Sequence, residues 1–475
     1  MRKIKSQILI LTLLPALLFV SCFEDNDDSF PPFSELNINE FVYRGLNFWY
    51  LYKGDVPDLA NDRFDSEADK IAFLEGFDSP EATFDALLAP QDRFSVIRSD
   101  YVAFEDALAG ISLSTGMRFS LVRNPNNESE VFGVVRYVVN NSPAADAGVL
   151  RGMLFRSVDG IELTENSDFE TLFGQPSFTI DLATYDGTDF TPTGESILLN
   201  QVELTVNPVH TTAIIETEGN TVGYLHYTGF TNEFDSDLNA VFAEFQTAGI
   251  TDLVLDLRYN GGGSIETAND LSSMITGQFN GQVFITQEYN EDRAEEYNDE
   301  RLFNNQIQGG GAINSLNLNR VFVLTTDRTA SASELILSGL EPYIEVIQIG
   351  TATTGKFEGS FLLYDAPAPN FSRSQANPNH RYVMLPLVLR SVNSVGFTDY
   401  ADGISPAANL TIAEDFANLG ALGDTNEPFL ALALEQITGM TKSQALKNTK
   451  VMQRLYEEEQ NSPIYQRMIV NDPIR

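Results

Sequence analysis

The 475-residue chain has little cysteine, histidine and basic charge. It holds one cysteine and three histidines, and 29 Lys and Arg residues stand against 67 Asp and Glu, a formal net charge of −38. A single cysteine excludes an internal disulfide framework and cysteine-rich zinc modules, and three scattered histidines leave little for a histidine-based metal site. The acidic balance argues against a nucleic-acid partner, because binding to phosphates depends on Lys and Arg. No metal, nucleotide or other cofactor is implied.

The N-terminus has the pattern of a secretory signal. Three basic residues lie within Met1–Lys5, and a mostly apolar run follows over Ile8–Val20. At about 13 residues, this run is shorter than the roughly 20 that span a membrane. It leads into LFVSC, which resembles a bacterial lipobox ending at Cys22, although an ordinary signal peptide is the alternative. We therefore expect a lipidated Cys22 that anchors the protein to a membrane.

The expected location is the cell envelope, as an outer-membrane lipoprotein on its periplasmic or surface-exposed face. An acidic stretch, EDNDD, follows Cys22 and resembles the export signals of some surface lipoproteins. The length predicts two to four domains. We expect a signal peptide (1–21), an acidic tether (22–33), a small helical N-terminal domain (34–100), a β-rich domain (101–208), a catalytic core (209–430) and a C-terminal helical tail (431–475).

The β-rich segment has the order of elements found in one binding module. A glycine-bearing loop at Gly116 precedes a strand, a second strand covers 131–139, and SPAADAG opens a short helix before a strand ending in VDG. This order resembles a PDZ domain of the bacterial protease type. The resemblance implies that Gly116, Met117, Arg118 and Phe119 bind the carboxylate of a substrate's C-terminal tail. Where the family has a second glycine this chain has Arg118, which either assists carboxylate capture or is an ordinary surface residue.

The segment from 209 to 430 alternates strands with helices. Strands are expected over 222–227, 253–257, 321–325 and 346–350, with helices over 235–248 and 266–275 and a polar insertion over 288–318. This alternation predicts an α/β core with parallel strands, in which function gathers at the carboxyl ends of the strands. Two loops follow such strands: NGGG, ending at Gly263, and TASASE, which contains Ser331.

The second loop has two readings. Ser331 and Glu334 fit a capping box before an apolar helix. A serine at a helix N-terminus is also placed beside backbone N–H groups that can stabilise an oxyanion. Lys356 lies 25 residues later and can serve as its base only if burial lowers its pKa toward the working pH.

The array of a PDZ-like segment, LDLRYNGGG, TASASE and GK resembles the C-terminal processing, or tail-specific, proteases of the S41 peptidase family. The resemblance implies a ClpP/crotonase-like α/β core and a serine endopeptidase that cleaves proteins with apolar C-terminal tails. By position, Ser331 is the nucleophile and Lys356 the general base, and the N–H groups of Ala332 and Gly263 form the oxyanion hole. Ser360 stands where the family often has a lysine-orienting glutamine, and either orients the lysine or marks reduced activity.

Two function classes remain open: an active lipid-anchored endopeptidase, and a weak or inactive relative that acts as a PDZ peptide-binding module. The three histidines, His210, His226 and His380, belong to no triad motif and are expected to be structural or exposed. The charge clusters 291–300 and 457–459 are expected to be solvated surface, and 441–460 to be a helix. The sequence does not decide the oligomeric state.

Overall fold

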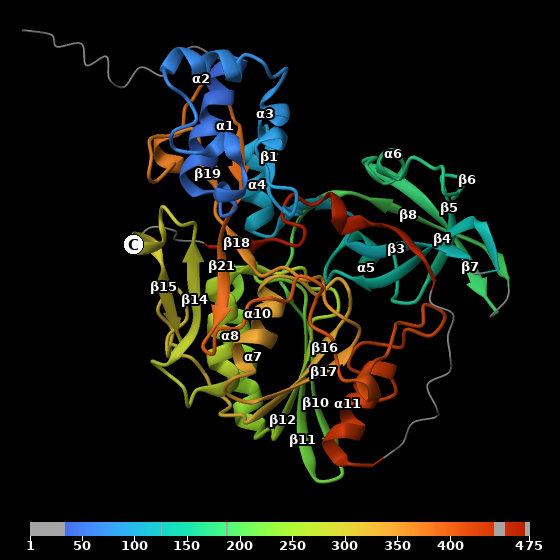
Figure 1. Cartoon of the computed structure of the whole chain (residues 1–475). Coiled ribbons are helices and arrows are strands. Elements are labelled where there is room, and N and C mark those ends of the chain that lie inside the picture. The colour runs from blue at the N-terminus through green and yellow to red at the C-terminus, as the bar shows by residue number, and fades with distance from the viewer. Residues whose placement is uncertain (1–33, 125, 187–188, 441–451, 471–475) are drawn as a thin grey trace, which may run out of the picture.

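The computed structural model describes residues 34–124, 126–186, 189–440 and 452–470. Its centre is a five-stranded sheet of order β10-β11-β12-β16-β17 (Figure 1). In this sheet β11, β12, β16 and β17 run parallel, and β10 pairs antiparallel with β11. The predicted α/β core with parallel strands is therefore confirmed. The strands are β10 (Val209–Thr217), β11 (Asn220–Tyr227), β12 (Asp252–Asp256), β16 (Arg320–Thr325) and β17 (Glu345–Gly350).

Helices cover both faces of this sheet, which explains why its strands read as apolar runs. Leu253, Val254 and Leu255 are fully buried. One face packs against α7 (Asp235–Ala248), α8 (Ile265–Thr276) and α10 (Ala332–Leu340), and the other against α11 (Pro428–Thr438). The expected helices over 235–248 and 266–275 are confirmed. Residues 209–440, called the α/β core below, carry the loops expected to hold the chemistry.

The N-terminal helices pack into the same apolar cluster as the α/β core. Phe41, Trp49 and Phe84 share this cluster with Phe361 and Leu389. The helices are α1 (Glu35–Trp49), α2 (Glu67–Leu74) and α3 (Pro80–Ala86), with 3₁₀ turns η2 (Lys53–Asp55) and η3 (Pro57–Leu59). The aromatic stripe of the first helix is therefore core.

Two further sheets lie beside the central one. A three-stranded sheet has the order β1-β20-β19, and a six-stranded sheet has the order β13-β23-β18-β21-β14-β15. The expected polar insertion is partly regular, because one strand extends to Tyr289 and its partner begins at Asp299. The strands are β1 (Val96–Arg98), β13 (Gly263–Ser264), β14 (Val283–Tyr289), β15 (Asp299–Leu302), β18 (Glu358–Ser360), β19 (Leu363–Tyr364), β20 (Val383–Leu385), β21 (Leu387–Asn393) and β23 (Met468–Ile469).

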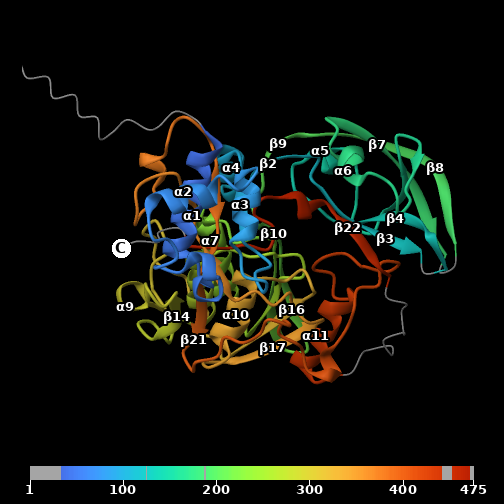
Figure 2. The ribbon, with the colours of Figure 1, turned by 45° about the horizontal axis from the view of Figure 1, so that its top comes forward.

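Residues 111–205 form a separate unit, called the β-rich unit below, with its own apolar cluster (Figure 2). Its main sheet has the order β22-β3-β4-β5-β7-β8, and α4 (Tyr101–Leu108) precedes it. The unit contains β2 (Ile111–Ser114), β3 (Met117–Asn124), β4 (Asn127–Val138), α5 (Pro143–Asp146), β5 (Leu154–Val158), β6 (Ile161–Glu162), α6 (Phe169–Phe173), β7 (Ser177–Tyr185), β8 (Phe190–Asn200) and β9 (Val202–Thr205).

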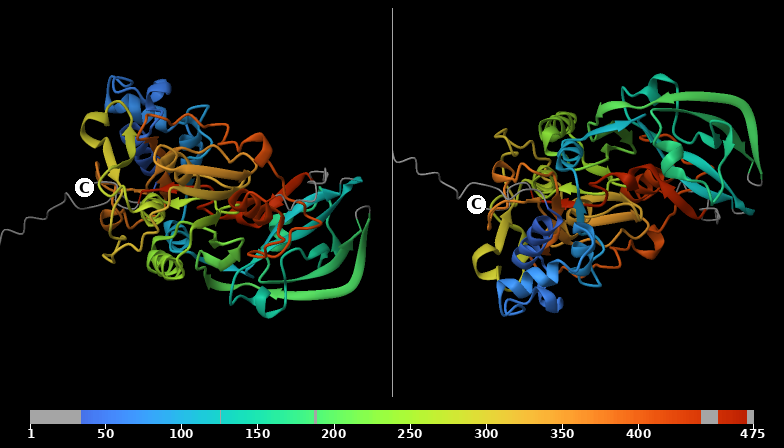
Figure 3. Two further views of the ribbon diagram at one scale, coloured as in Figure 1. Left: turned by 90° about the horizontal axis from the view of Figure 1, so that it is seen from below. Right: turned by 90° about the horizontal axis from the view of Figure 1, so that it is seen from above.

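The last described segment, residues 452–470, corrects the expected C-terminal helix and is called the tail segment. It forms strand β22 (Arg454–Glu457), a 3₁₀ turn η7 (Glu458–Asn461) and strand β23. The helix expected over 441–460 is therefore wrong for 452–460, and its remainder lies outside the described residues. Pairing with β3 overrides the local helical pattern. Both views in Figure 3 show this red segment running between the β-rich unit and the α/β core.

Candidate active site

Ser331 lies at the carboxyl end of β16, immediately before α10. Its backbone has φ 64° and ψ −118°, a conformation that non-glycine residues rarely adopt. Its side chain is fully buried, and its Oγ has no hydrogen-bond partner among the described residues. The rare backbone conformation holds an unpaired hydroxyl at a helix N-terminus, and such conformations occur often at functional sites.

Glu334 fastens the serine loop to the lysine loop. One carboxylate oxygen, Oε2, accepts the N–H of Ser331 at 2.7 Å and that of Lys356 at 2.9 Å. The other, Oε1, accepts the N–H of Gly355 at 2.6 Å and the Thr353 hydroxyl at 2.5 Å. The expected capping box is present at this helix start, and its firm contact is the Ser331 N–H donated to Glu334. Glu334 was the signal for a helix start, and its positioning of both loops was not foreseen.

Lys356 has the burial that a lysine needs if its pKa is to fall far enough for it to act as a general base. It is fully buried, and its Nζ has no hydrogen-bond partner among the described residues. The Nζ atom lies 4.3 Å from the centre of the Phe94 ring. Burial lowers the pKa of Lys356 to about 7, against the opposing charge of Glu358. A large neutral fraction of this amine therefore exists near pH 7.

Ser360 lies in β18, on the strand that follows Lys356. Its Oγ is buried and has no partner in the part of the chain that the structure describes, so Ser360 and Lys356 are not hydrogen-bonded to each other. The orienting role of Ser360 stays a prediction. Glu358 lies on the same strand and accepts the Tyr52 hydroxyl on Oε1 at 2.6 Å, while its buried Oε2 has no partner among the described residues.

The two expected oxyanion donors differ in their surroundings. The N–H of Ala332 is the first of α10, and the first N–H groups of a helix have no partner within it. The N–H of Gly263 donates to the carbonyl of Arg467 at 2.8 Å. Gly262 must be glycine, because its φ is 107° and a Cβ atom there would lie 2.8 Å from Ser331 Oγ. The NGGG loop therefore lies directly against the serine.

The four residues expected to bind a substrate tail lie at the start of β3. Met117 and Phe119 are buried in the cluster of the β-rich unit, and Gly116 has φ 81°. Arg118 is not an ordinary surface residue, since its side chain is 11% exposed and forms an ion pair with Glu458. It holds a carboxylate, but one that belongs to this chain.

The acidic run 457–459 is not solvated surface, and this expectation is wrong. Glu457 is 3% exposed, and each of the three carboxylates pairs with a different arginine. The partners, Arg118, Arg136 and Arg328, are far away in sequence, so no local signal identified the pairing. The other cluster, 291–300, carries exposed acidic side chains as expected.

The histidines take no part in the serine site. His226 is fully buried and its Nδ1 lies 3.1 Å from Nδ1 of His210. His380 pairs with Asp365 at 3.0 Å. Within the described ranges, no group of three or more His, Cys, Asp or Glu side chains is arranged to hold a metal ion.

Two family models match the chain. Residues 221–363 match the model for peptidase family S41, and residues 37–96 match that for the peptidase S41 N-terminal domain. The first span contains the NGGG loop, Ser331, Lys356 and Ser360, and the second contains α2, α3 and all but the first two residues of α1. The residues assembled above therefore lie in the part of the chain that resembles a peptidase.

The chain also resembles individual proteins. It is 27% identical to a carboxy-terminal-processing protease of Bartonella bacilliformis, over 46% of this chain and 47% of the relative, so that alignment spans less than half of the relative. It is 24% identical to a carboxyl-terminal-processing protease of Picosynechococcus, over 66% and 69%. A crystal structure of a putative S41 protease from Bacteroides fragilis is 28% identical, with a TM-score of 0.69 over 87% of this chain and 99% of the other. These similarities support a relation of this chain to peptidase family S41 and its carboxy-terminal-processing members.

Proposed function

We propose that this protein is a serine endopeptidase of the C-terminal processing type that acts through a dyad of Ser331 and Lys356. The observation that carries the proposal is the state of Lys356, which is fully buried, lacks a carboxylate hydrogen bond and has a pKa lowered to about 7. Its backbone is held by the same carboxylate oxygen as the backbone of Ser331.

In the mechanism, the neutral amine of Lys356 takes the proton of Ser331 as Oγ attacks the substrate carbonyl. The N–H groups of Ala332 and Gly263 stabilise the oxyanion, once the Arg467 carbonyl has left Gly263. The protonated lysine then gives its proton to the leaving amine. Water, deprotonated by the same lysine, hydrolyses the acyl-enzyme and restores the serine. Glu334 positions both partners.

The β-rich unit supplies the recognition part of the proposal, as a PDZ domain. A ligand strand would add to β3 with its end at Gly116 to Phe119. This geometry suits a protease that recognises substrates by their C-terminal tails. The sequence resemblance implied apolar tails, although the expected tail-binding loop carries the positive charge of Arg118.

The second candidate is a peptide-binding protein with weak or no catalysis. Ser360, in the place of the usual glutamine, motivates it, and so does the complete burial of Ser331 and Lys356. Retention of a buried, unpaired lysine favours the enzyme, because an unpaired amine in an apolar site costs stability and a binding module has no use for it.

The test is cleavage of unstructured proteins by the chain from residue 23 onward, followed by mass spectrometry of the products. We expect the wild type to cleave, and Ser331→Ala and Lys356→Met to lose cleavage while keeping the wild-type circular dichroism spectrum. Cleavage that survives both substitutions would contradict the dyad. Peptide binding without cleavage by any form would favour the second candidate.

We also propose a lipid anchor at Cys22 on the outer membrane, a position outside the described residues. Among the residues that are described, no helix is long and apolar enough to cross a membrane. Metabolic labelling with an alkyne fatty acid tests the anchor. Label on the wild type and none on Cys22→Ser is expected, and equal labelling would contradict it.

A further inference from the structure

The tail segment occupies the edge of β3, the strand that carries the expected tail-binding residues. Strand β22 pairs antiparallel with β3, with Tyr456 opposite Leu121 and Glu457 opposite Ser120. The Tyr456 side chain is 6% exposed and its ring lies 6.0 Å from Phe173 and 5.5 Å from Phe169, between ring centres. An added strand with an aromatic side chain in an apolar pocket is the arrangement by which such edges bind peptides.

Three consecutive carboxylates of the tail segment meet three arginines, called the arginine trio. Glu457 pairs with Arg328, Glu458 with Arg118, and Glu459 with Arg136. The side chains of the trio are only 5%, 11% and 1% exposed in the same order. Buried guanidinium groups need carboxylate partners, because an unpaired buried charge is costly.

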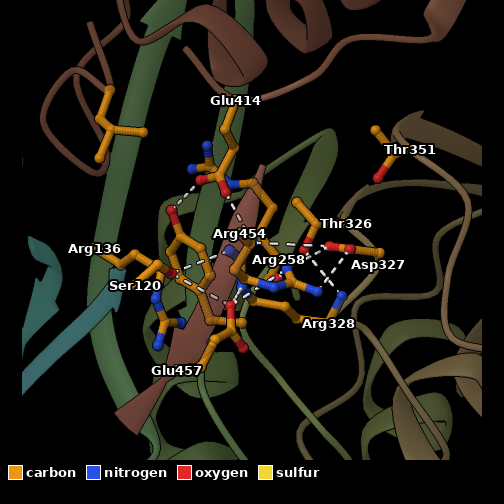
Figure 4. Close-up of polar contacts among 12 residues, drawn as sticks. Ser120, Arg136, Arg258, Thr326, Asp327, Arg328, Thr351, Glu414, Arg454 and Glu457 are labelled. Carbon is orange, nitrogen blue, oxygen red and sulfur yellow. Dashed lines mark hydrogen bonds and ion pairs between the residues drawn. The ribbon is translucent and has the colours of Figure 1, made fainter. Parts of the chain in front are cut away.

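The trio joins the two parts of the molecule, the β-rich unit and the α/β core, which are called the two bodies below. Arg118 and Arg136 come from β3 and β4 of the β-rich unit, whereas Arg328 comes from the loop before Ser331. Figure 4 shows Glu457 beside Arg328, with Arg136 and Ser120 close by. Glu414 adds a contact of 3.0 Å to Arg328. The tail carboxylates thereby fill a cationic site that both bodies build.

The same segment then covers the catalytic residues. Gln466 donates to the Thr354 hydroxyl at 3.0 Å, and the Arg467 carbonyl accepts the Gly263 N–H at 2.8 Å. Strand β23 pairs parallel with β13 and β18. Ser331 and Lys356 have no exposed surface beneath it. A substrate carbonyl therefore cannot reach the Gly263 N–H while Arg467 holds this position.

Space for an incoming peptide already exists beside the tail segment. A cavity of about 620 Å³ lies between the bodies, and its lining includes Arg118, Arg136, Arg328, Gly262 and Glu458. It connects the arginine trio with the NGGG loop, so one extended chain can contact both.

From these contacts we propose that the β3 edge and the arginine trio form a binding site for an acidic peptide segment with an aromatic anchor, and that the tail segment occupies this site in cis and keeps the dyad closed. The site selects acidic tails, in place of the apolar tails that the sequence resemblance implied. The effect on cleavage rests on the proposed protease function, whereas the binding site does not.

The first experiment measures binding of a fluorescein-labelled peptide RLYEEEQN, the sequence of residues 454–461, by fluorescence anisotropy. The proteins are the chain from residue 23 onward, its Glu457→Gln/Glu458→Gln/Glu459→Gln variant, and a matched Glu295→Gln/Glu296→Gln/Glu300→Gln control on the exposed acidic cluster. We expect the tail variant to bind the peptide at least tenfold more tightly than the wild type, and the control to equal the wild type. RLYQQQQN should bind the tail variant at least tenfold more weakly.

Equal binding by the tail variant and the wild type, or equal binding of the two peptides, would overturn the proposal. The same three proteins are then compared in the cleavage assay, where the tail variant should cleave at least tenfold faster. No cleavage by any form, with the binding difference intact, would contradict the protease function and not the site. Equal cleavage together with equal binding would contradict the site and not the protease.

A charge swap between Arg118 and Glu458 gives a second test of the same contact if the tail variant fails to fold. With an unstructured substrate that lacks an acidic tail, and so does not need Arg118, Arg118→Glu alone should raise the cleavage rate because it repels Glu458, and adding Glu458→Arg should return the rate to the wild-type value. Thermal melting monitors folding in each form. A double variant as fast as Arg118→Glu alone would overturn the cis contact.

Discussion

Lys356 and Arg328 are two buried basic side chains in neighbouring loops that differ in their partners. Arg328 binds the carboxylates of Glu457 and Glu414, whereas the amine of Lys356 has no hydrogen-bond partner among the described residues. Burial alone lowers the pKa of both side chains. For Arg328 the two carboxylates more than reverse this effect and its pKa is raised, while the pKa of Lys356 falls to about 7. The lack of a close partner, and not burial alone, leaves Lys356 with the lowered pKa that the proposed base requires.

The difference between Lys356 and Arg328 is removed most completely if Lys356 is replaced by a side chain that stays charged. We expect Lys356→Arg to lower kcat/KM by at least ~10³-fold, because a guanidinium cannot lose its proton at working pH and the dyad acts as a unit. Steady-state cleavage by the tail variant, Glu457→Gln/Glu458→Gln/Glu459→Gln, with and without Lys356→Arg, measures the loss. Lys53→Arg is the matched control, since Lys53 is buried but paired with Asp292. A Lys356→Arg enzyme with substantial activity would rule out proton removal by this side chain.

The same contrast predicts opposite effects on stability. Arg328→Met removes the cation that the buried carboxylates of Glu457 and Glu414 share, and leaves Glu457 only its more exposed pair with Arg454, so the free energy of unfolding should fall by about 3–5 kcal/mol. Lys356→Met removes an unpaired amine and should raise the free energy of unfolding by a few kcal/mol at pH 7. Urea denaturation measures both changes.

The pH dependence of the second change has a definite sign. The folded pKa of Lys356, about 7, lies below the ordinary lysine value of 10.5, so the unfolded chain binds more protons between these values and stability rises with pH there. The stabilisation by Lys356→Met should therefore be largest at or below pH 7 and shrink toward pH 10. A gain that is independent of pH would mean that Lys356 is charged in the folded protein.

The smallest effect is expected at Ser360. Because its Oγ makes no hydrogen bond to Lys356, Ser360→Ala should change kcat/KM by less than about tenfold, which is below the roughly 10²–10⁴-fold that a positioned proton-transfer group contributes. Cleavage kinetics with kcat and KM separated measure this change. A loss of more than a hundredfold in kcat alone would establish Ser360 as the residue that orients the lysine.

Much of the fold and of the serine site could be predicted from the sequence because both have local signals. The apolar run 253–257 and the helix over 235–248 follow from hydrophobic pattern, and Ser331 and Lys356 each lie in a short motif next to a strand. Their pairing as a dyad came from the resemblance to peptidase family S41 and stays a prediction, while the structure shows that Glu334 Oε2 accepts the backbone N–H groups of both residues.

The tail segment could not be predicted, because its structure depends on residues far away in sequence. The acidic run 457–459 looks like solvated surface until Arg118, Arg136 and Arg328 are brought to it by folding. The helical pattern of 452–460 gives way to pairing with β3, more than 300 residues earlier in the chain. Glu334 was recognised only as a helix cap, because its contacts with Gly355 and Lys356 are tertiary.

The central claim is that Lys356 is the base. Its most direct test is the pH profile of kcat/KM for the tail variant with and without Glu358→Gln. The negative charge of Glu358 raises the pKa of Lys356. The account predicts activity that rises with pH through about 7, and a rise displaced to lower pH by Glu358→Gln, but not by Glu288→Gln on strand β14, which lies two strands away in the same sheet. A rise that stays in place after Glu358→Gln, or an activity that is flat through pH 7, would contradict it.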